Sequence, residues 1–302
     1  SSSSAASDVY KRQVVTTSSS CLEALGLSQG IDILRLHVNI NNVDFIDGKN
    51  ITSERLATIM KTNLKSVART FPPSIHEMHL LFNDLIARGV TEVFVCVISS
   101  KFSQTLPMLE ELKVHYANRL HIFVYDTKTL NIAEGALAYE AKVLIEQGES
   151  FENVAKKLDD LRRHSEFLFT LSDLDYIIRN KKLSAPAAFV ANLFDIKPIM
   201  QINQIGEIIA VEKVRKLEKT LITMAKTVEK FAANQPAFIY LTDTGHHEST
   251  EFFKKILATH FGWHDLPVIR VSTISLANHG LMGTGIGVFY GELPHIVKAL
   301  KK

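Results

Sequence analysis

The sequence predicts an α/β fold with two domains: an N-terminal domain on a mostly parallel sheet flanked by helices (α/β/α), and a C-terminal α/β domain on a mixed or antiparallel sheet. The chain has 302 residues, 46% of them hydrophobic, so it is long enough to build two domain cores. In its first half, short β-branched runs alternate with segments of helical periodicity, which is typical of βαβ units. In its second half, hairpin-like turns occur between strands and long helices, which indicates a different kind of sheet.

The predicted strands of the N-terminal domain are four β-branched or aromatic runs. They lie at residues 14–16, 31–40, 93–98 and 121–125. Helical segments lie between them, as parallel strands require. We therefore expect a largely parallel sheet.

Two helices of this domain have clear start and stop signals. Ser74 and Glu77 form a capping box, in which the serine oxygen accepts from the Glu77 amide and the carboxylate reaches back. Gly89 is the expected stop of that helix. Ser150 begins a second helix directly after Gly148, which is expected to end the preceding one. The apolar faces of the two helices contain Leu80, Leu81, Leu85 and Ile86, and Phe151, Val154, Leu158 and Leu161.

The C-terminal domain is expected to begin near Ser165, which gives domains of residues 13–165 and 166–302. Residues 1–12 open with a serine-rich run and are expected to be a disordered, tag-like segment. The strands predicted after the boundary are residues 166–170, 198–202, 207–211, 237–241, 268–271 and 285–290, with a hairpin turn at 203–206 and a long helix at 213–233.

Charge and composition exclude several classes of partner. Lys and Arg number 34 against 32 Asp and Glu, a net charge of +2, and no long basic block occurs, so we expect no nucleic-acid partner. No apolar stretch reaches the roughly 18 to 20 residues of a membrane span, and no export signal opens the chain, so we expect no stable membrane insertion. Cys21 and Cys96 lie far apart without a second pair, which indicates reduced thiols and a cytoplasmic protein.

Hydroxyl side chains follow the predicted strands of the first domain. They occur at residues 16–20, 99–103 and 127, and Thr70 stands shortly before the capped helix. In open α/β sheets, ligands bind beyond the carboxyl ends of the strands, and hydroxyls with helix N-terminal amides can hold a carboxylate or phosphate without a metal. The same residue types are ordinary turn and N-cap residues, and spacing alone favours that interpretation.

Motifs for metal, nucleotide or covalent chemistry are weak. The glycines of residues 280–287 lead into a strand pattern, whereas a dinucleotide loop leads into a helix, so close backbone packing is the better explanation. His76 and His79, like residues 246–248, lack the spacing of a metal site, and no nucleophile elbow occurs. We therefore expect no metal or cofactor. His279 lies in a glycine-rich loop before a strand, where a ligand contact and an ordinary loop histidine are equally good interpretations.

Four stretches form an ordered set of motifs. The most specific reads LDYIIRNKKLS at residues 174–184 and continues as ANLFDIKPI at 191–199; the others are DGKNIT at 47–52, ISSKFS at 98–103 and EKVR at 212–215. In type and order these stretches resemble the DegV family of bacterial fatty-acid-binding proteins. The resemblance extends from about residue 14 to the C-terminus.

The resemblance implies a two-domain binding protein that is not itself an enzyme. Such a protein encloses a long-chain fatty acid such as palmitate between its domains and holds the carboxylate at the end of the first domain's sheet. In the family, the acid is presented to a separate fatty acid kinase catalytic subunit, which makes an acyl-phosphate for phospholipid synthesis. The implied partners are therefore a fatty acid and that kinase subunit, with no further cofactor.

The resemblance also implies individual site residues. Thr70 and Ser103 match the carboxylate-binding hydroxyls, His279 completes the polar network, and Ser18 matches the serine after the first strand. Lys182 stands where the family has an arginine, which preserves the charge but not the two-pronged geometry. Two further departures are Gln104 in place of a glycine, and Phe71 with Pro72 in place of a serine and a glutamine. The chain therefore resembles a divergent member of the family.

Two alternatives stand beside the carrier hypothesis. One is a small-molecule phosphotransferase or hydrolase that uses His279 and the hydroxyl cluster, an analogy drawn at the level of the fold. The other is a protein-interaction module whose lipid site has decayed, which Gln104 and Phe71 would favour.

Overall fold

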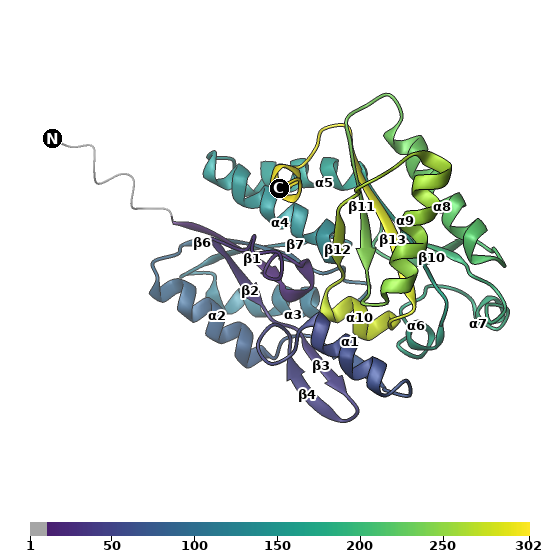
Figure 1. Cartoon of the computed structure of the whole chain (residues 1–302). Coiled ribbons are helices and arrows are strands. Elements are labelled where there is room, and N and C mark those ends of the chain that lie inside the picture. Colours follow the sequence, from purple (N-terminus) through teal and green to yellow (C-terminus); the bar gives the residue numbers. More distant parts are fainter. Residues whose placement is uncertain (1–10) are drawn as a thin grey trace.

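The computed structural model describes residues 11–302, which form three sheets and the helices that cover them (Figure 1). The four-stranded sheet is parallel throughout, in the order β2-β1-β6-β7. Its strands are β1 (Arg12–Thr17), β2 (Ile31–Leu34), β6 (Glu92–Val97) and β7 (His121–Asp126). The predicted parallel sheet of the first domain is thereby confirmed.

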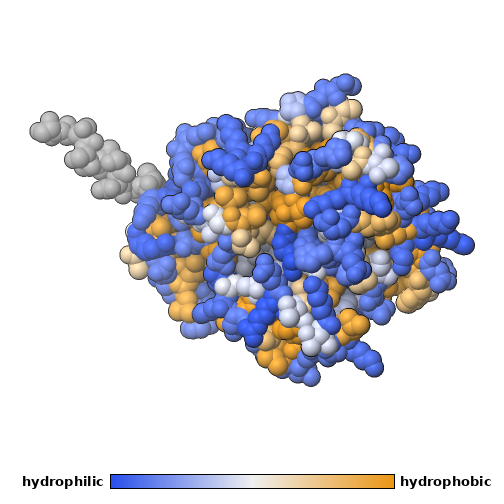
Figure 2. Space-filling view, viewed as in Figure 1, coloured by the Kyte–Doolittle hydropathy of each residue, from blue (hydrophilic) through white to orange (hydrophobic). Residues whose placement is uncertain are grey.

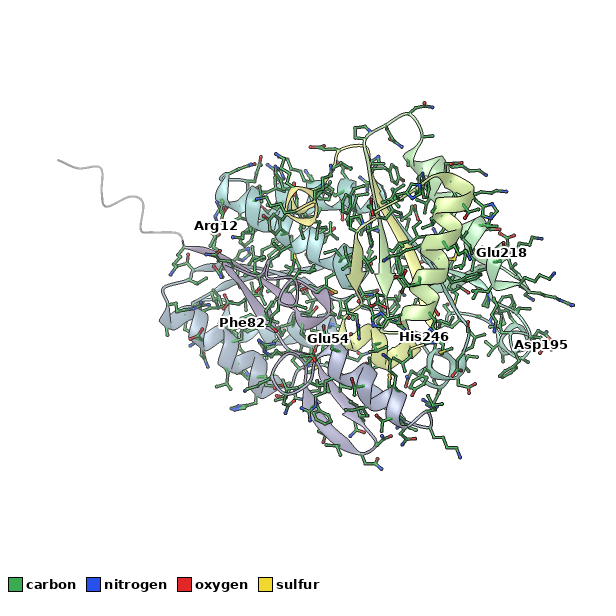
Figure 3. The ribbon with its side chains drawn as sticks, in the orientation of Figure 1. Arg12, Glu54, Phe82, Asp195, Glu218 and His246 are labelled. Carbon is green, nitrogen blue, oxygen red and sulfur yellow. The ribbon has the colours of Figure 1, made fainter. Side chains whose placement is uncertain are left out.

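Helices cover both faces of the parallel sheet. Successive side chains of its strands point to opposite faces, and both faces are apolar. Val93 and Val95 face one layer, which contains α2 (Ile75–Ala87) and α3 (Thr105–Leu112). Phe94 and Cys96 face the other layer, which contains α4 (Asn131–Glu146) and α5 (Phe151–Arg163). Phe82 of α2 is fully buried in the first of these layers (Figure 3). This two-sided burial is what near-continuous hydrophobic strands require. The 3-10 turns η1 (Ser18–Ser20) and η2 (Lys113–Tyr116) follow β1 and α3.

The run at residues 31–40 is not one strand, contrary to the prediction. It divides into β2 and β3 (His37–Ile40), which belong to different sheets. The break lies at Arg35 and Leu36, because the Arg35 guanidinium pairs with Glu23 at 2.7 Å and the Leu36 amide donates to Ser18 Oγ at 3.0 Å. The strand β3 pairs antiparallel with β4 (Val43–Ile46) and β5 (Ala68–Phe71), and α1 (Ser53–Thr62) packs beside this small sheet.

The third sheet has six strands in the order β10-β9-β8-β13-β11-β12. Only β11 and β12 pair in parallel, and the other pairs are antiparallel, so the predicted mixed sheet is confirmed. One face packs against α8 and α9 and the other contributes to the core around α4 (Figure 1). The strands and helices are β8 (Ser165–Leu171), β9 (Ile199–Ile202), β10 (Ile208–Glu212), β11 (Ala237–Asp243), β12 (Val268–Arg270), β13 (Gly283–Tyr290), α6 (Asp175–Arg179), α7 (Ala187–Val190), α8 (Leu217–Ala232), α9 (His247–Phe261), α10 (Thr273–His279) and α11 (Ile296–Leu300).

The two halves of the chain share their cores. One hydrophobic cluster joins α4 of the first half to β11 and β13 of the second, and another joins α1 to α10. Arg270 Nε donates to Ser53 Oγ at 3.3 Å across this junction. Figure 2 shows hydrophobic residues where the halves meet, with hydrophilic residues around them.

Two predicted boundaries need correction. The predicted disordered segment, residues 1–12, lies outside the described residues up to residue 10, but Arg12 belongs to β1. Its guanidinium donates to the carbonyls of Glu149 and Ile145 at 2.6 and 2.9 Å, which fixes the strand's first residue. The long helix α8 begins four residues later than predicted, at Leu217, because the Val214 carbonyl accepts from the Lys197 amide of another segment.

The start signals of α2 and α5 are confirmed. Ser74 accepts from the Glu77 amide at 3.1 Å while Glu77 accepts from the Ser74 amide at 2.7 Å, and Ser150 caps α5 through the Asn153 amide. The stop residue Gly89 adopts a φ of +83°, which a residue with a Cβ rarely adopts.

Ser74→Ala is expected to lower the free energy of unfolding by about 1 kcal/mol, because the Glu77 amide at the start of α2 loses its acceptor. Ser74→Thr keeps a hydroxyl and is the control, expected to stay close to the wild type. Urea unfolding followed by circular dichroism measures both. Equal losses in the two variants would contradict a capping role.

Candidate functional site

A cavity, here called the apolar cavity, lies between the two halves of the chain. Most of its wall is hydrophobic. On one side it follows the sheet face formed by Phe167, Phe169 and Leu171 of β8. The remaining lining residues are Ile98, Phe102, Leu130, Asn131, Ile177, Lys182, Ile202, Ile208, Thr242, Thr244, Val271, Ser275, Asn278, His279, Gly283 and Thr284.

Glycines on β13 leave room for this cavity and its wall. A Cβ at Gly283 would lie 2.6 Å from the Leu171 side chain, and one at Gly285 would lie 2.7 Å from the Phe167 ring. Both distances are too short for real contacts, so β8 side chains lie over the bare backbone of β13. The predicted role of these glycines, close backbone packing, is confirmed.

A second cavity, here called the hydroxyl cavity, adjoins the first and is more polar. Ile98, Phe102 and Lys182 line both cavities, so these three residues mark the junction. The other residues of the hydroxyl cavity are Leu36, Thr70, Phe71, Pro72, Ser100, Lys101, Ser103, Gln104 and Ile274.

Three of the residues predicted from the sequence meet at the hydroxyl cavity. Thr70 comes from β5, Ser103 from the turn after β6, and Lys182 from the loop after α6. Thr70 Oγ1 accepts from Asn278 Nδ2 at 3.1 Å, so the Thr70 hydroxyl proton is available to a ligand. Ser103 Oγ lies 2.7 Å from Thr105 Oγ1. Two hydroxyls and a cation on one wall are suitable partners for a carboxylate.

Lys182 is a partly buried cation at the junction of the two cavities. Its Nζ donates to the Phe102 carbonyl at 2.7 Å. Burial lowers the pKa of Lys182 below its ordinary value, and no neighbouring carboxylate of the described chain counteracts this. An anion bound beside Nζ would therefore relieve an unfavourable charge.

His279 lies at the C-terminal end of α10, not in a loop as predicted. Its Nδ1 lies 2.8 Å from the Gly280 carbonyl, which can only accept, so Nδ1 carries the proton and Nε2 accepts from Ser275 Oγ at 2.9 Å. Ser275 Oγ in turn accepts from Asn131 Nδ2 at 3.0 Å. Burial lowers the pKa of His279 to about 4. At neutral pH the imidazole is uncharged, and it holds Ser275 on the cavity wall.

Ser18 lines neither cavity, although it was a predicted site residue. Its hydroxyl accepts from the Leu36 amide at 3.0 Å and lies beside the carboxyl group of Asp47, where it lowers the pKa of that group. Asp47 is buried, and its burial raises its pKa to about 6. Ser18 therefore supports the loop that follows β2.

The hydroxyls of Thr17, the last residue of β1, and of Ser19 in η1 are directed into the protein. Ser19 Oγ donates to Glu134 Oε2 at 2.7 Å, and Thr17 Oγ1 donates to the other carboxylate oxygen while it accepts from the Ile98 amide at 2.9 Å. Glu134 is fully buried in α4. Its burial raises its pKa to about 8 despite these hydrogen bonds. The hydroxyls of Thr17 and Ser19 therefore bond an internal carboxyl group, a role that neither the ligand-binding nor the turn and N-cap interpretation of the sequence predicted.

The sequence did not single out Asn131, Ser275 or Asn278, which complete the polar wall. Asn131 adopts a φ of +59° at the start of α4, and its side chain bonds both the Ser272 amide and Ser275. The spacing of four residues between Ser275 and His279 was a usable signal, but only once the segment was known to be helical.

Within residues 11–302, no group of three His, Cys, Asp or Glu side chains is arranged to hold a metal ion. No helix in the same range combines the length and hydrophobicity needed to cross a bilayer.

One protein-family model matches most of the chain. Residues 11–291 match the model described as "Uncharacterised protein, DegV family". The chain belongs to the DegV family. The resemblance predicted from the motifs is thereby confirmed.

Relatives and solved structures match this DegV chain over nearly its whole length. A DegV domain-containing protein of Streptococcus pneumoniae is 28% identical over 95% of this chain and 100% of its own. A structure described as a fatty acid binding DegV family protein of Streptococcus agalactiae has a TM-score of 0.83 and 24% identity, covering 94% of this chain and 100% of that one. A stearic acid-binding protein of Eubacterium ventriosum has a TM-score of 0.77 and 21% identity, covering 93% and 98%. At these identities, the structural matches show a shared fold.

Proposed function

We propose that this DegV chain is a carrier that binds one long-chain fatty acid, such as palmitate, and presents its carboxylate to a fatty acid kinase catalytic subunit. The observation that supports it best is the junction of two cavities, one apolar and one lined by hydroxyls, with the cation of Lys182 between them. The fatty-acid-binding descriptions of two structural neighbours agree with it. We assign the acyl tail to the apolar cavity and the carboxylate to the hydroxyl cavity.

Hydrophobic burial can supply most of the affinity. About fifteen methylenes at ~0.8 kcal/mol each amount to roughly 12 kcal/mol before the loss of ligand freedom is subtracted. The carboxylate must then be hydrogen-bonded, since burying a bare charge is costly. Thr70, Ser103 and Lys182 are its proposed partners, and His279 acts through Ser275 as a positioning residue.

The departures from the family pattern are compatible with binding. Gln104 has a φ of −80°, a conformation that any residue adopts, so the lost glycine costs no backbone strain. Its side chain and the Phe71 ring are both exposed at the edge of the hydroxyl cavity. This exposed rim is the surface on which we propose that the kinase subunit docks.

The enzyme alternative is the less favoured one. A general base must be poised to accept a proton near neutral pH, whereas burial lowers the pKa of His279 to about 4 and both of its nitrogens are engaged within the protein. We therefore propose that phosphoryl transfer to the acid occurs on the kinase subunit. A cytoplasmic location is part of the proposal, because Cys21 and Cys96 are buried free thiols, which a reducing compartment preserves.

Native mass spectrometry of the freshly purified protein, followed by analysis of its organic extract, tests the carrier function. A bound mass that matches a fatty acid is the expected result. A protein that is empty and takes up no added palmitate would overturn the proposal. Addition of ATP and a fatty acid kinase catalytic subunit to the loaded protein tests presentation, and failure to form acyl-phosphate would overturn that part alone.

Thr70→Val and Ser103→Ala are each expected to weaken palmitate binding about tenfold, because a hydrogen bond to an ionised carboxylate contributes about 1.5 kcal/mol. Thr58→Val is the control, since Thr58 donates only to the Glu54 carbonyl on α1. Isothermal titration of the delipidated protein measures all three variants. Unchanged affinity in both site variants would show that the carboxylate does not bind in the hydroxyl cavity.

A further inference from the structure

Asn278 connects the two halves of the chain at the candidate site. It lies in the last turn of α10 and lines the apolar cavity, whereas Thr70 of β5 lines the hydroxyl cavity. Asn278 Nδ2 donates to Thr70 Oγ1 at 3.1 Å, a hydrogen bond between residues 208 positions apart. The amide group is therefore in direct contact with one of the proposed carboxylate-binding hydroxyls.

The orientation of the Asn278 amide is fixed by its own helix. Nδ2 also donates to the carbonyl of Ile274, one turn earlier in α10, at 2.9 Å. A carbonyl oxygen can only accept a hydrogen bond, so a rotated amide would bring Oδ1 against another acceptor. The nitrogen must therefore be the atom that faces Thr70 Oγ1.

This orientation leaves the other end of the amide unsatisfied. Asn278 Oδ1 is buried and has no hydrogen-bond partner within residues 11–302. Buried acceptors without a partner are unfavourable and uncommon in folded proteins. Here the oxygen is left without a partner because Nδ2 satisfies two acceptors at once.

The hydrogen bond from Asn278 determines what the Thr70 hydroxyl can do. The Nδ2 donor occupies a lone pair of Oγ1, so the hydroxyl proton points away from Asn278 and can be donated into the hydroxyl cavity. A hydroxyl that accepts one hydrogen bond also donates a stronger one, because linked hydrogen bonds polarise one another. Thr70 is therefore a better donor with Asn278 beside it than without it.

Ser103, the second proposed hydroxyl, is arranged in the same way. Its Oγ accepts from the Thr105 amide at 3.2 Å, and a backbone amide can only donate. Each hydroxyl thus has a lone pair occupied by a nitrogen of the protein. An ionised carboxylate, which can only accept, matches such an arrangement.

We infer that Asn278 is a positioning residue, which orients and polarises the Thr70 hydroxyl as a donor to the ligand carboxylate without itself contacting that carboxylate. The inference rests on the proposed function, because it takes the ligand to be a fatty acid with its carboxylate in the hydroxyl cavity. It adds a residue from the second half of the chain to a site whose hydroxyls belong to the first.

Two substitutions separate the two hydrogen bonds of the amide. Asn278→Leu has a similar shape and removes both bonds, whereas Asn278→Ser can keep a bond to the Ile274 carbonyl but is too short to reach Thr70. Each is expected to weaken palmitate binding about fivefold, less than Thr70→Val, because the hydroxyl remains but is no longer oriented. Isothermal titration of the delipidated protein measures this, after urea unfolding has shown that each variant is folded.

The matched control is Asn192→Leu. Asn192 Nδ2 also donates to a carbonyl four residues earlier, that of Ala188, at 2.9 Å, but at an exposed position. This variant loses the same kind of bond away from both cavities, and its affinity for palmitate should equal that of the wild type.

A double-mutant cycle distinguishes positioning from a purely structural effect. If Asn278 acts through Thr70, Asn278→Leu has no further effect on palmitate binding when it is added to Thr70→Val. Losses that multiply in the double variant, or unchanged affinity in both Asn278 variants, would overturn the inference and leave the proposed function intact. A wild type that binds no fatty acid would overturn both.

Discussion

Between pH 5 and pH 8, the variant Glu134→Gln is expected to gain about 3 kcal/mol of unfolding free energy relative to the wild type. In the folded protein the pKa of Glu134 is raised to about 8 by burial, against an ordinary value of 4.5. Between these two values, the folded state holds a proton that the unfolded state releases. Rising pH therefore favours unfolding of the wild type. Glutamine has no proton to release, so its contribution stays constant.

The variant also keeps most of the local contacts. Glutamine has the shape of the protonated glutamic acid and can still bond the hydroxyls of Thr17 and Ser19, which now hold Glu134. Urea unfolding at several pH values measures the difference between variant and wild type. Glu229→Gln, the same change on the exposed face of α8, is the control for the loss of one carboxyl group at a solvent-exposed position. A flat difference for Glu134→Gln would mean that the buried group is ionised.

The sequence predicted those features that depend on neighbouring residues. The capping box of Ser74 and Glu77 lies within one turn of helix, and the alternation of Val93, Phe94 and Val95 belongs to a single strand, so both could be read locally. The turn at residues 203–206 was predicted for the same reason, and the Asn203 amide indeed donates to the Glu207 carbonyl at 2.8 Å.

Partners that are distant in sequence could not be predicted in this way. Thr17 donates a hydrogen bond to Glu134, which lies 117 positions away in the sequence. No residue near Thr17 indicates that its hydroxyl already has this partner. The helix that ends at His279 is short, and the glycine-rich segment after it resembles a loop in sequence. His279 was therefore predicted to lie in a loop. For Thr70, Ser103 and Lys182, the family motifs supplied what local pattern could not, because those motifs come from three separated segments that converge only in the fold.

Lys182→Met is expected to weaken the binding of palmitate about a hundredfold, and to change the binding of its methyl ester little. Removing one member of a desolvated charge pair costs about 2 to 5 kcal/mol, mainly because the remaining charge is left uncompensated. Here the remaining charge is the ligand's carboxylate, and the ester carries none. Methionine retains the apolar length of the lysine chain, so the wall at Ile98 and Phe102 is preserved.

The comparison of acid with ester separates charge from packing. If Lys182 mattered only by filling space, both ligands would weaken together in Lys182→Met. Lys182→Arg, which restores the residue type of the family motif, is expected to recover acid binding, because the guanidinium stays charged and can hold both carboxylate oxygens. Lys181→Met removes the exposed neighbouring charge and should leave both ligands unaffected. Since burial already lowers the pKa of Lys182, acid binding should also decline at a lower alkaline pH than an ordinary lysine would give, and this decline should be absent for the ester.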